Sequence, residues 1–206
     1  MEKTDKKSEI LRAAELLFSE FGFEGTSTRQ IAKESGANMA MINYYFGSKE
    51  GVFLEIMESR ISGFKTQLDL IDRERISPKE KLLLVIEQYT KQIFANVRFH
   101  KMMQRELSLM QRPEIFSQIK DAVASNRKVI EHIIEKGIED GLFRKVDIRM
   151  SIASIMGTIT LIATSPSKVE DMQDFDFEND EHRELLRSRL VTHLQDLLIT
   201  HLNVQK

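Results

Sequence analysis

The sequence predicts an all-α protein, and three observations lead to that prediction. The 206 residues include only 3 prolines and 9 glycines, so few positions interrupt a helix. Apolar residues recur at spacings of three and four, the period of one helix face, rather than at the spacing of two that is typical of strands. Short motifs typical of helix N-termini divide the chain into about nine segments. We therefore expect about nine helices and no strand.

The first expected helix covers residues 5–21 and ends at Gly22. A left-handed C-terminal cap at this glycine would fold Phe23 back onto Phe18. One apolar stripe follows the helix: Ile10, Ala14, Leu17, Phe18 and Phe21. The lysines at its start are expected to form a solvated tail rather than an arm in the minor groove of DNA: Lys3, Lys6 and Lys7.

Two short helices separated by a tight turn come next. Ser27 and Gln30 form a capping box, which predicts a helix that ends at Gly36. Asn38 is a good N-cap for a second helix that ends near Tyr45. Each helix has only about two turns, so both must pack on their neighbours. This arrangement is typical of a helix-turn-helix motif, whose second helix enters the major groove of DNA.

The remaining helices are longer. Ser48 caps a helix that continues to Ile71, and the sequence Ser77-Pro78-Glu80 contains an N-cap, a first-turn proline and a capping-box acid. After a break near residue 99, the expected helices cover a short methionine-bearing segment and residues 113–141, 147–162 and 186–197. The acidic stretch 170–181 is expected to be a mobile surface loop.

Composition and motifs exclude several classes of function. The chain has no cysteine, so it has no disulfides and no thiol chemistry. Its longest apolar run is too short to cross a membrane and its N-terminus lacks a secretory signal, so we expect a cytoplasmic protein without a membrane partner. The histidines lack metal-binding spacing, and the sequence has no recognisable catalytic triad or phosphate-binding glycine loop. We expect no cofactor, no metal and no enzyme.

One stretch resembles a known family. The run TSTRQIAKESGANMAMINYYFGSKEGVF, residues 26–53, resembles the TetR family of transcriptional regulators, which share a threonine-rich helix start, an Ile-Ala pair, a turn glycine and an aromatic-Phe-x-Ser-Lys ending. The resemblance implies a DNA-binding domain over residues 1–50 and a helical effector-binding and dimerisation domain over residues 51–206. It also implies a homodimer that reads the two half-sites of a palindromic operator in double-stranded DNA.

The expected DNA contacts come from both short helices. Ser27 and Thr28 would offer hydroxyls and exposed amides to a phosphate, and Arg29 could reach either a phosphate or a guanine. Lys49 matches the family's phosphate-contacting lysine. The full set of expected DNA-binding residues is Ser27, Thr28, Arg29, Asn38, Met39, Ala40, Met41, Asn43, Tyr44, Tyr45 and Lys49.

Two features depart from the family's pattern. Asn43 stands where many members carry tyrosine, so it could bind a phosphate, read an adenine or simply be solvated. Met39 and Met41 replace commoner polar residues, and thioethers would contact thymine methyl groups rather than form bidentate hydrogen bonds. Tyr45 could belong to the core instead of the DNA contact. Residues 1–50 hold seven Lys and Arg against eight Asp and Glu, so charge alone gives no reason to expect DNA.

An effector pocket is expected among the central helices. Glu106 falls on the same helix face as several methionines, which could adapt to an apolar ligand while the carboxylate binds a cation or a hydrogen-bond donor. Ordinary core packing is the alternative for this face. The candidate ligand-binding residues are Phe64, Tyr89, Phe94, Met102, Met103, Glu106, Met110 and Phe116.

The last two helices are expected to form a four-helix dimer interface, because their apolar stripes are long. Leu194 and Leu197 are the test positions on this surface, and packing within one chain is the alternative.

The sequence as a whole predicts a ligand-responsive repressor released from a palindromic operator by a small, largely apolar effector. The alternative is a helical small-molecule-binding or scaffold protein that has lost DNA binding.

Overall fold

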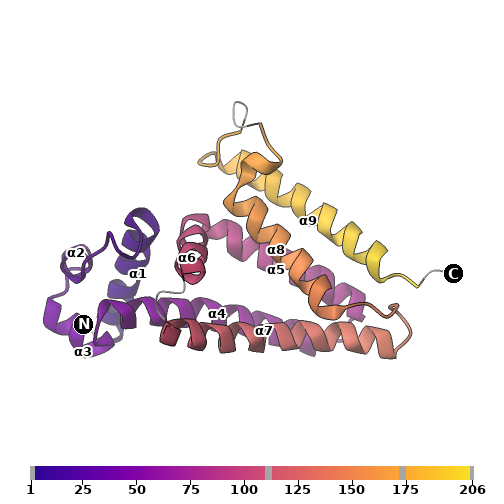
Figure 1. Ribbon diagram of the computed structural model, residues 1–206, viewed down its shortest axis with the longest axis horizontal. Coiled ribbons are helices and arrows are strands. Elements are labelled where there is room, and N and C mark those ends of the chain that lie inside the picture. The colour runs from indigo at the N-terminus through magenta and orange to yellow at the C-terminus, as the bar shows by residue number, and fades with distance from the viewer. Residues whose placement is uncertain (1–2, 110–112, 172–174, 205–206) are drawn as a thin grey trace. The chain divides into compact units, whose positions relative to one another are not determined.

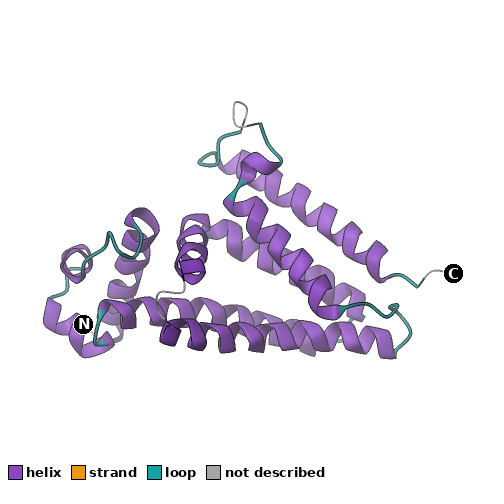
Figure 2. Cartoon of the chain, viewed as in Figure 1, coloured by secondary structure: helices purple, strands orange, loops and turns teal. Residues whose placement is uncertain are grey.

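The computed structural model describes residues 3–109, 113–171 and 175–204. Within these ranges the chain is helical, with loops and turns between the helices and no strand (Figure 1, Figure 2). The α-helices are α1 (Lys3–Phe21), α2 (Thr28–Glu34), α3 (Met39–Phe46), α4 (Lys49–Arg73), α5 (Pro78–Ala95), α6 (Val97–Leu109), α7 (Pro113–Glu139), α8 (Ile148–Thr164) and α9 (Asp180–Leu202), and a 3-10 helix, η1, covers Pro166–Lys168. The all-α prediction is confirmed.

The chain divides into two compact units. Unit 1 contains residues 1–63 and 98–123, and unit 2 contains residues 64–97 and 124–206. Unit 1 therefore includes most of α6 and the first part of α7 in addition to α1, α2 and α3. The helix α4 contributes residues to both units, with the boundary after Gly63.

Unit 1 is built around three phenylalanine rings. Phe18 stacks on Phe23 with ring centroids 5.4 Å apart, and Phe53 meets both rings edge-on at 5.7 and 5.2 Å. Gly22 has a φ of 76°, so it adopts the left-handed conformation that turns the chain from α1 back toward this cluster. The predicted fold-back of Phe23 onto Phe18 is confirmed. The rest of this core includes Ile10, Ala14, Ile31, Ile42, Val52, Met57, Phe99, Met102 and Ile119.

Unit 2 is a separate core formed mainly by α5, α8 and α9, which contact one another. The predicted capping box starts α5: the backbone amide of Glu80 donates to Ser77 Oγ at 3.3 Å, and Glu80 Oε2 accepts from the Ser77 amide at 2.8 Å. The Ser77 hydroxyl also donates to Glu80 Oε2 at 2.6 Å, and this bond, together with the one from the Ser77 amide, stabilises the carboxylate and lowers the pKa of Glu80. The buried side chains of α8 include Ile152, Ile155, Ile159 and Ile162.

The apolar stripe of α9 lies inside one chain. Leu194 is 1% exposed, and its neighbours along the stripe, Leu186, Leu190 and Leu198, are also buried in the core of unit 2. Leu197 is 43% exposed. The expectation that this stripe as a whole forms the dimer interface is therefore wrong, because its residues are already covered by α5 and α8. The alternative of packing within one chain holds for Leu194.

Two further expectations need correction. The break expected near residue 99 lies at Asn96, which caps α5 just before α6 begins. The acidic stretch 170–181 is partly anchored, because Phe175 and Phe177 pack against the core of unit 2 and the Phe177 ring lies 6.2 Å from that of Phe94. Residues 172–174 of this stretch lie outside the described residues.

Two leucines of α4 provide a matched test of this core. Leu68 is 0% exposed in unit 2, whereas Leu70 is 52% exposed. Leu68→Ala removes buried methyl groups and leaves a cavity, so we expect it to lower the free energy of unfolding by about 2–5 kcal/mol. Leu70→Ala should change it by less than about 0.5 kcal/mol. Urea denaturation followed by circular dichroism measures both, and equal losses would contradict this core assignment.

Candidate nucleic-acid interface

Local hydrogen bonds fix the starts of α2 and α3. The backbone amide of Gln30 donates to Ser27 Oγ at 3.2 Å, and Gln30 Oε1 accepts from the Ser27 amide at 2.8 Å. At the start of α3, Asn38 Oδ1 accepts from the Met41 amide at 2.9 Å. Between the helices, Gly36 has a φ of 60°, which permits the tight turn. Both predicted N-caps are confirmed.

One face of each short helix is buried and the other is exposed. Ile31 and Ala32 of α2 and Ile42 of α3 are buried in the core of unit 1. Because these residues pack inward, the opposite faces of the helices are presented to solvent. The exposed residues among the expected DNA contacts are Ser27, Arg29, Asn38, Met39, Ala40, Asn43 and Tyr44.

Four of the expected contacts are less exposed. Thr28, Met41, Tyr45 and Lys49 are half-buried. Tyr45 packs partly against the core of unit 1, and its ring meets that of Tyr44 at 5.2 Å in an edge-on arrangement. Tyr44 itself is 73% exposed. Tyr44 is therefore the more exposed of the two tyrosines, and Tyr45 lies between it and the core of unit 1.

The lysines near this face are engaged with the protein itself. The Lys49 ammonium donates to the carbonyl oxygens of Phe23 and Thr26, each at 2.9 Å. Lys7 pairs with Glu55 of α4 at 2.7 Å, and Lys6 pairs with Glu9 and reaches the Ser35 carbonyl at 3.3 Å. The expected solvated tail is therefore incorrect for Lys6 and Lys7, which join α1 to its neighbours.

Cationic groups on α2 remain exposed. Arg29 and Lys33 are both exposed on this helix, next to the turn that leads into α3. Glu34 is also exposed there. The surface around α3 therefore contains positive charge that can contact a phosphate backbone, although it is not strongly basic. The hydroxyl of Ser27 already donates to Gln30 Oε1 at 2.7 Å, so its proton is used inside the capping box.

The expected ligand-binding residues fall into two groups. Phe64, Tyr89 and Phe94 belong to unit 2, where the Phe64 and Tyr89 rings lie 5.1 Å apart. Burial raises the pKa of the Tyr89 phenol, and its hydrogen bond with Thr160 at 3.3 Å acts in the opposite direction. These three side chains lie in or against the apolar core of that unit.

The second group lies in unit 1. Met102 is buried in the core of unit 1, Met103 packs against that core, and Glu106 is half-buried on the same helix. The structure therefore does not place all the expected ligand residues in one cluster. Met110 lies outside the described residues, as does the side chain of Phe116.

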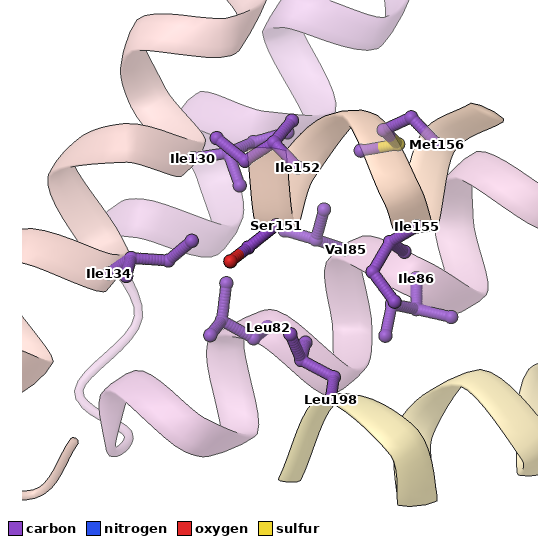
Figure 3. Close-up of a pocket in the computed structure, with 10 residues that line it drawn as sticks. All are labelled: Leu82, Val85, Ile86, Ile130, Ile134, Ser151, Ile152, Ile155, Met156 and Leu198. Atoms are coloured by element: carbon purple, nitrogen blue, oxygen red, sulfur yellow. The ribbon is translucent and has the colours of Figure 1, made fainter. Parts of the chain in front are cut away.

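A small apolar cavity lies among α5, α7, α8 and α9 of unit 2 (Figure 3). Its volume is about 20 Å³. Apart from Ser151, which points into the space between the helices in Figure 3, the lining is apolar. The lining residues are Leu82, Val85, Ile86, Ile130, Ile134, Ser151, Ile152, Ile155, Met156 and Leu198. This cavity could not be predicted from the sequence, because a helical stripe has the same spacing whether it lines a cavity or fills a core.

A cluster of three polar side chains, Ser151, His201 and Arg144, lies at one side of this cavity. Ser151 Oγ lies 3.1 Å from His201 Nε2, and Arg144 Nη2 lies 3.1 Å from His201 Nδ1. Arg144 also donates from Nε to the His201 carbonyl at 2.6 Å. Since an arginine only donates hydrogen bonds, His201 Nδ1 accepts, and the neutral imidazole donates from Nε2 to the serine. These bonds join the end of α9 to the start of α8.

Among the residues that the structure describes, no helix is both long and apolar enough to cross a membrane. In the same part of the chain, no group of three or more histidine, aspartate or glutamate side chains could hold a metal ion.

Comparison with known protein families gives two matches. Residues 10–56 match the model described as bacterial regulatory proteins of the tetR family. Residues 75–164 match the model of a tetracycline repressor-like C-terminal domain. Together the two matches cover the helix-turn-helix segment and the helices from α5 to α8, and they end before α9.

Individual relatives agree with these matches. The chain is 31% identical to the HTH-type transcriptional repressor NicS of Pseudomonas putida over 156 residues, which covers 73% of this chain and 71% of that one. It is 25% identical to the fatty acid metabolism regulator protein of Bacillus subtilis over 80% of this chain and 84% of that one. The solved structure of FadR from Bacillus subtilis with stearoyl-CoA shares the fold, with a TM-score of 0.77 at 23% identity over 95% of this chain and 99% of that one.

Proposed function

Because the chain belongs to the TetR family of bacterial regulatory proteins, we propose that it represses transcription from a palindromic operator and is released by an acyl-bearing effector. The chain is a ligand-responsive, DNA-binding transcriptional regulator, as its relatives are. The observation that carries the proposal is the exposed face of α3, which is held outward by the burial of Ile42. We propose no catalytic role for the chain.

The exposed face of α3 suits the major groove. Asn38 uses its oxygen as a cap, so its amide nitrogen is available to donate to a phosphate or a base edge. Asn43 can form the paired hydrogen bonds that distinguish adenine. Met39 and Ala40 offer apolar contact to thymine methyl groups. This composition favours an operator rich in A·T pairs at the positions that α3 contacts.

Arg29 is the expected DNA contact that a single substitution can test most directly. It is exposed on α2 and can donate to a phosphate or to guanine O6 and N7. In the dimer, two such surfaces lie about 34 Å apart, the distance of one DNA turn.

Two helices of unit 2 carry exposed apolar side chains that suit a dimer interface. Leu161 of α8 is 50% exposed, and Leu185 and Leu197 of α9 are 69% and 43% exposed. Their burial against a second copy of the chain would remove this apolar surface from water. A dimer also places two recognition helices on one operator, which neither protomer could occupy alone.

The effector must open the cavity that it enters. A volume of about 20 Å³ holds no more than a water molecule, so the helices of unit 2 must separate to admit a ligand. An acyl chain matches the apolar lining. Two relatives from Bacillus subtilis support this class of effector: one is named a fatty acid metabolism regulator, and the solved structure of FadR contains stearoyl-CoA. An effector that binds the opened state more tightly than the closed state by about 1–3 kcal/mol would weaken operator binding measurably.

Arg29→Ala should weaken operator binding by about 1–3 kcal/mol if Arg29 reads a guanine, and the loss should disappear when that base pair is changed. If Arg29 contacts a phosphate, the slope of log affinity against log salt should fall by about 1. Titration of a labelled operator at several salt concentrations separates the two. Arg75→Ala is the matched control, because Arg75 is exposed outside unit 1. Unchanged affinity and slope for Arg29→Ala would show that Arg29 does not contact the DNA.

Leu197→Glu should produce monomers, because a charge on this exposed apolar position disfavours burial against a second copy. We expect sedimentation at the monomer mass and weaker operator binding, with the fold retained by circular dichroism. Leu142→Glu is the control, since Leu142 is 51% exposed in the turn after α7. If the Leu197 variant sediments as a full dimer, Leu197 is not part of the dimer interface.

Stearoyl-CoA should release the protein from its operator and raise its melting temperature, because it binds the folded state. Acetyl-CoA and free coenzyme A carry the same nucleotide without the long chain and should have little effect. A gel shift and a thermal melt with the three compounds measure the response. Equal effects of all three would contradict an acyl-chain effector and would leave DNA binding, measured separately by the same gel shift, intact.

A further inference from the structure

Two small cavities of unit 2 lie next to each other and share part of their lining. The inner cavity is the apolar one of about 20 Å³ among α5, α7, α8 and α9. The outer cavity has a volume of about 10 Å³ and lies at the C-terminal end of α9, beside the start of α5. The residues that line the outer cavity are Lys79, Leu82, Leu83, Phe143, Leu198, Ile199, Leu202 and Asn203.

Leu82 and Leu198 form the wall between the two cavities. Both residues line both spaces, and Figure 3 shows them at one side of the inner cavity. Both side chains are buried, one on α5 and one on α9. A leucine can change rotamer without breaking a hydrogen bond. Rotation of these two side chains, with a small separation of α5 from α9, would therefore join the cavities into one apolar channel.

The outer end of this channel carries positive charge. Lys79 lines the outer cavity, is exposed, and forms no salt bridge with another residue of the described ranges. Arg144 is also exposed and directly follows Phe143, which lines the same cavity. The Arg144 amide donates to the Leu202 carbonyl at 2.9 Å, and its Nε donates to the His201 carbonyl at 2.6 Å, so this residue is held at the end of α9. The N–H groups of its guanidinium that do not contact His201 can donate to an anion.

The carboxylates nearest to these two cations along the chain are used in helix starts. Glu80 Oε2 accepts hydrogen bonds from the amide and the hydroxyl of Ser77 at the start of α5. Asp147 Oδ1 accepts from the Met150 amide at 3.0 Å at the start of α8. Neither carboxylate forms a salt bridge with Lys79 or Arg144. The two cations are therefore available to an anionic group at the outer end of the channel.

We propose that the effector enters unit 2 at this end, with an anionic head group bound by Lys79 and Arg144 and an apolar chain in the channel between Leu82 and Leu198. The inference rests on the proposed function, because it assigns a head-group site and an entry route to the same acyl-bearing effector. A carboxylate and a phosphate share the chemistry that lysine and arginine bind. The required ligand is thus an anion with an apolar tail.

Four compounds with similar chains separate the contribution of the head group from that of the tail. Decanoate and decanoyl-CoA are anionic, 1-decanol is neutral and decyltrimethylammonium is cationic. Isothermal titration calorimetry of the full, DNA-free chain measures each affinity below the micelle concentration. We expect at least one anionic compound to bind about tenfold more tightly than the neutral and cationic ones, because it meets two cations. The comparison of decanoate with decanoyl-CoA shows whether a carboxylate or a phosphate is preferred.

Lys79→Gln removes one of the two cations from an exposed position. The affinity for the tighter anionic compound should fall by about threefold to fivefold, and the affinity for 1-decanol should not change. Lys79→Arg keeps the charge and should restore the affinity. Lys91→Gln is the matched control, because Lys91 is exposed on the same helix and lines neither cavity.

NMR spectra of the protein with isotope-labelled leucine methyl groups locate the bound chain. The signals of Leu82, Leu198 and Leu202 should shift when the tighter anionic compound is added, since these residues line the channel from its wall to its outer end. The signal of Leu70, which is exposed on α4 and lines neither cavity, should stay in place. Shifts of Leu82 and Leu198 without Leu202 would place the entry elsewhere and overturn the proposal.

Three other outcomes would also decide against this site. Equal affinities of the anionic and neutral compounds, or an unchanged affinity in Lys79→Gln, would show that these cations bind no head group. If none of the four compounds binds, the channel and the acyl-bearing effector both fail. If an anionic compound binds at this site but does not release the protein from its operator, the proposed effector response fails, while the head-group site stands.

Discussion

The burial of Ile31 and Ile42 against the phenylalanine cluster of unit 1 is the constraint on which the DNA-contacting surface depends. α2 and α3 contain 7 and 8 residues, too few to be stable as isolated helices in water. Their stability must therefore come from packing. The same packing fixes which residues face outward, because each helix has only one face left when the other is buried.

This constraint explains why the motif was predictable from the sequence. The N-caps at Ser27 and Asn38 depend on hydrogen bonds between residues three apart, and the apolar spacing shows which side must be buried. Such signals are local, so a single sequence contains them. The start of α5 at Pro78 follows from the same kind of local pattern.

The features that were not predicted depend on residues distant in the chain. Leu194 and Leu197 are three residues apart on one helix, yet one is buried against α5 and α8 and the other is exposed. For Met102 the sequence left both an effector pocket and core packing open, and the side chain packs in the core of unit 1. The partners of Lys49 lie more than 20 positions away. Spacing identifies an apolar face or a charged residue, and only the tertiary structure shows what it contacts.

The division of the chain into units limits how a ligand can affect DNA binding. The boundaries after residues 63 and 123 lie inside α4 and α7, and the boundary after residue 97 lies at the first residue of α6, directly after the non-helical Asn96. Two of the three covalent connections between the units are therefore continuous helices. A helix transmits a displacement along its axis because its backbone hydrogen bonds resist bending. Of these two helices, α4 leads directly into the short helices that we propose to contact DNA.

The use of lysines inside unit 1 also shapes the binding energetics. Lys6, Lys7 and Lys49 contact protein groups, which leaves Arg29 and Lys33 as the exposed cations of α2 next to the recognition helix. In the proposed complex, few phosphate contacts per protomer would release few counterions, so binding that is independent of sequence would be weak. The proposed base contacts by α3, together with DNA shape, would then supply the discrimination between sequences. Because one protomer of such modest charge would bind DNA weakly, the contacts of two protomers would be needed for stable binding to the operator. The modest charge of this surface is thus a physical reason for the chain to bind as a dimer.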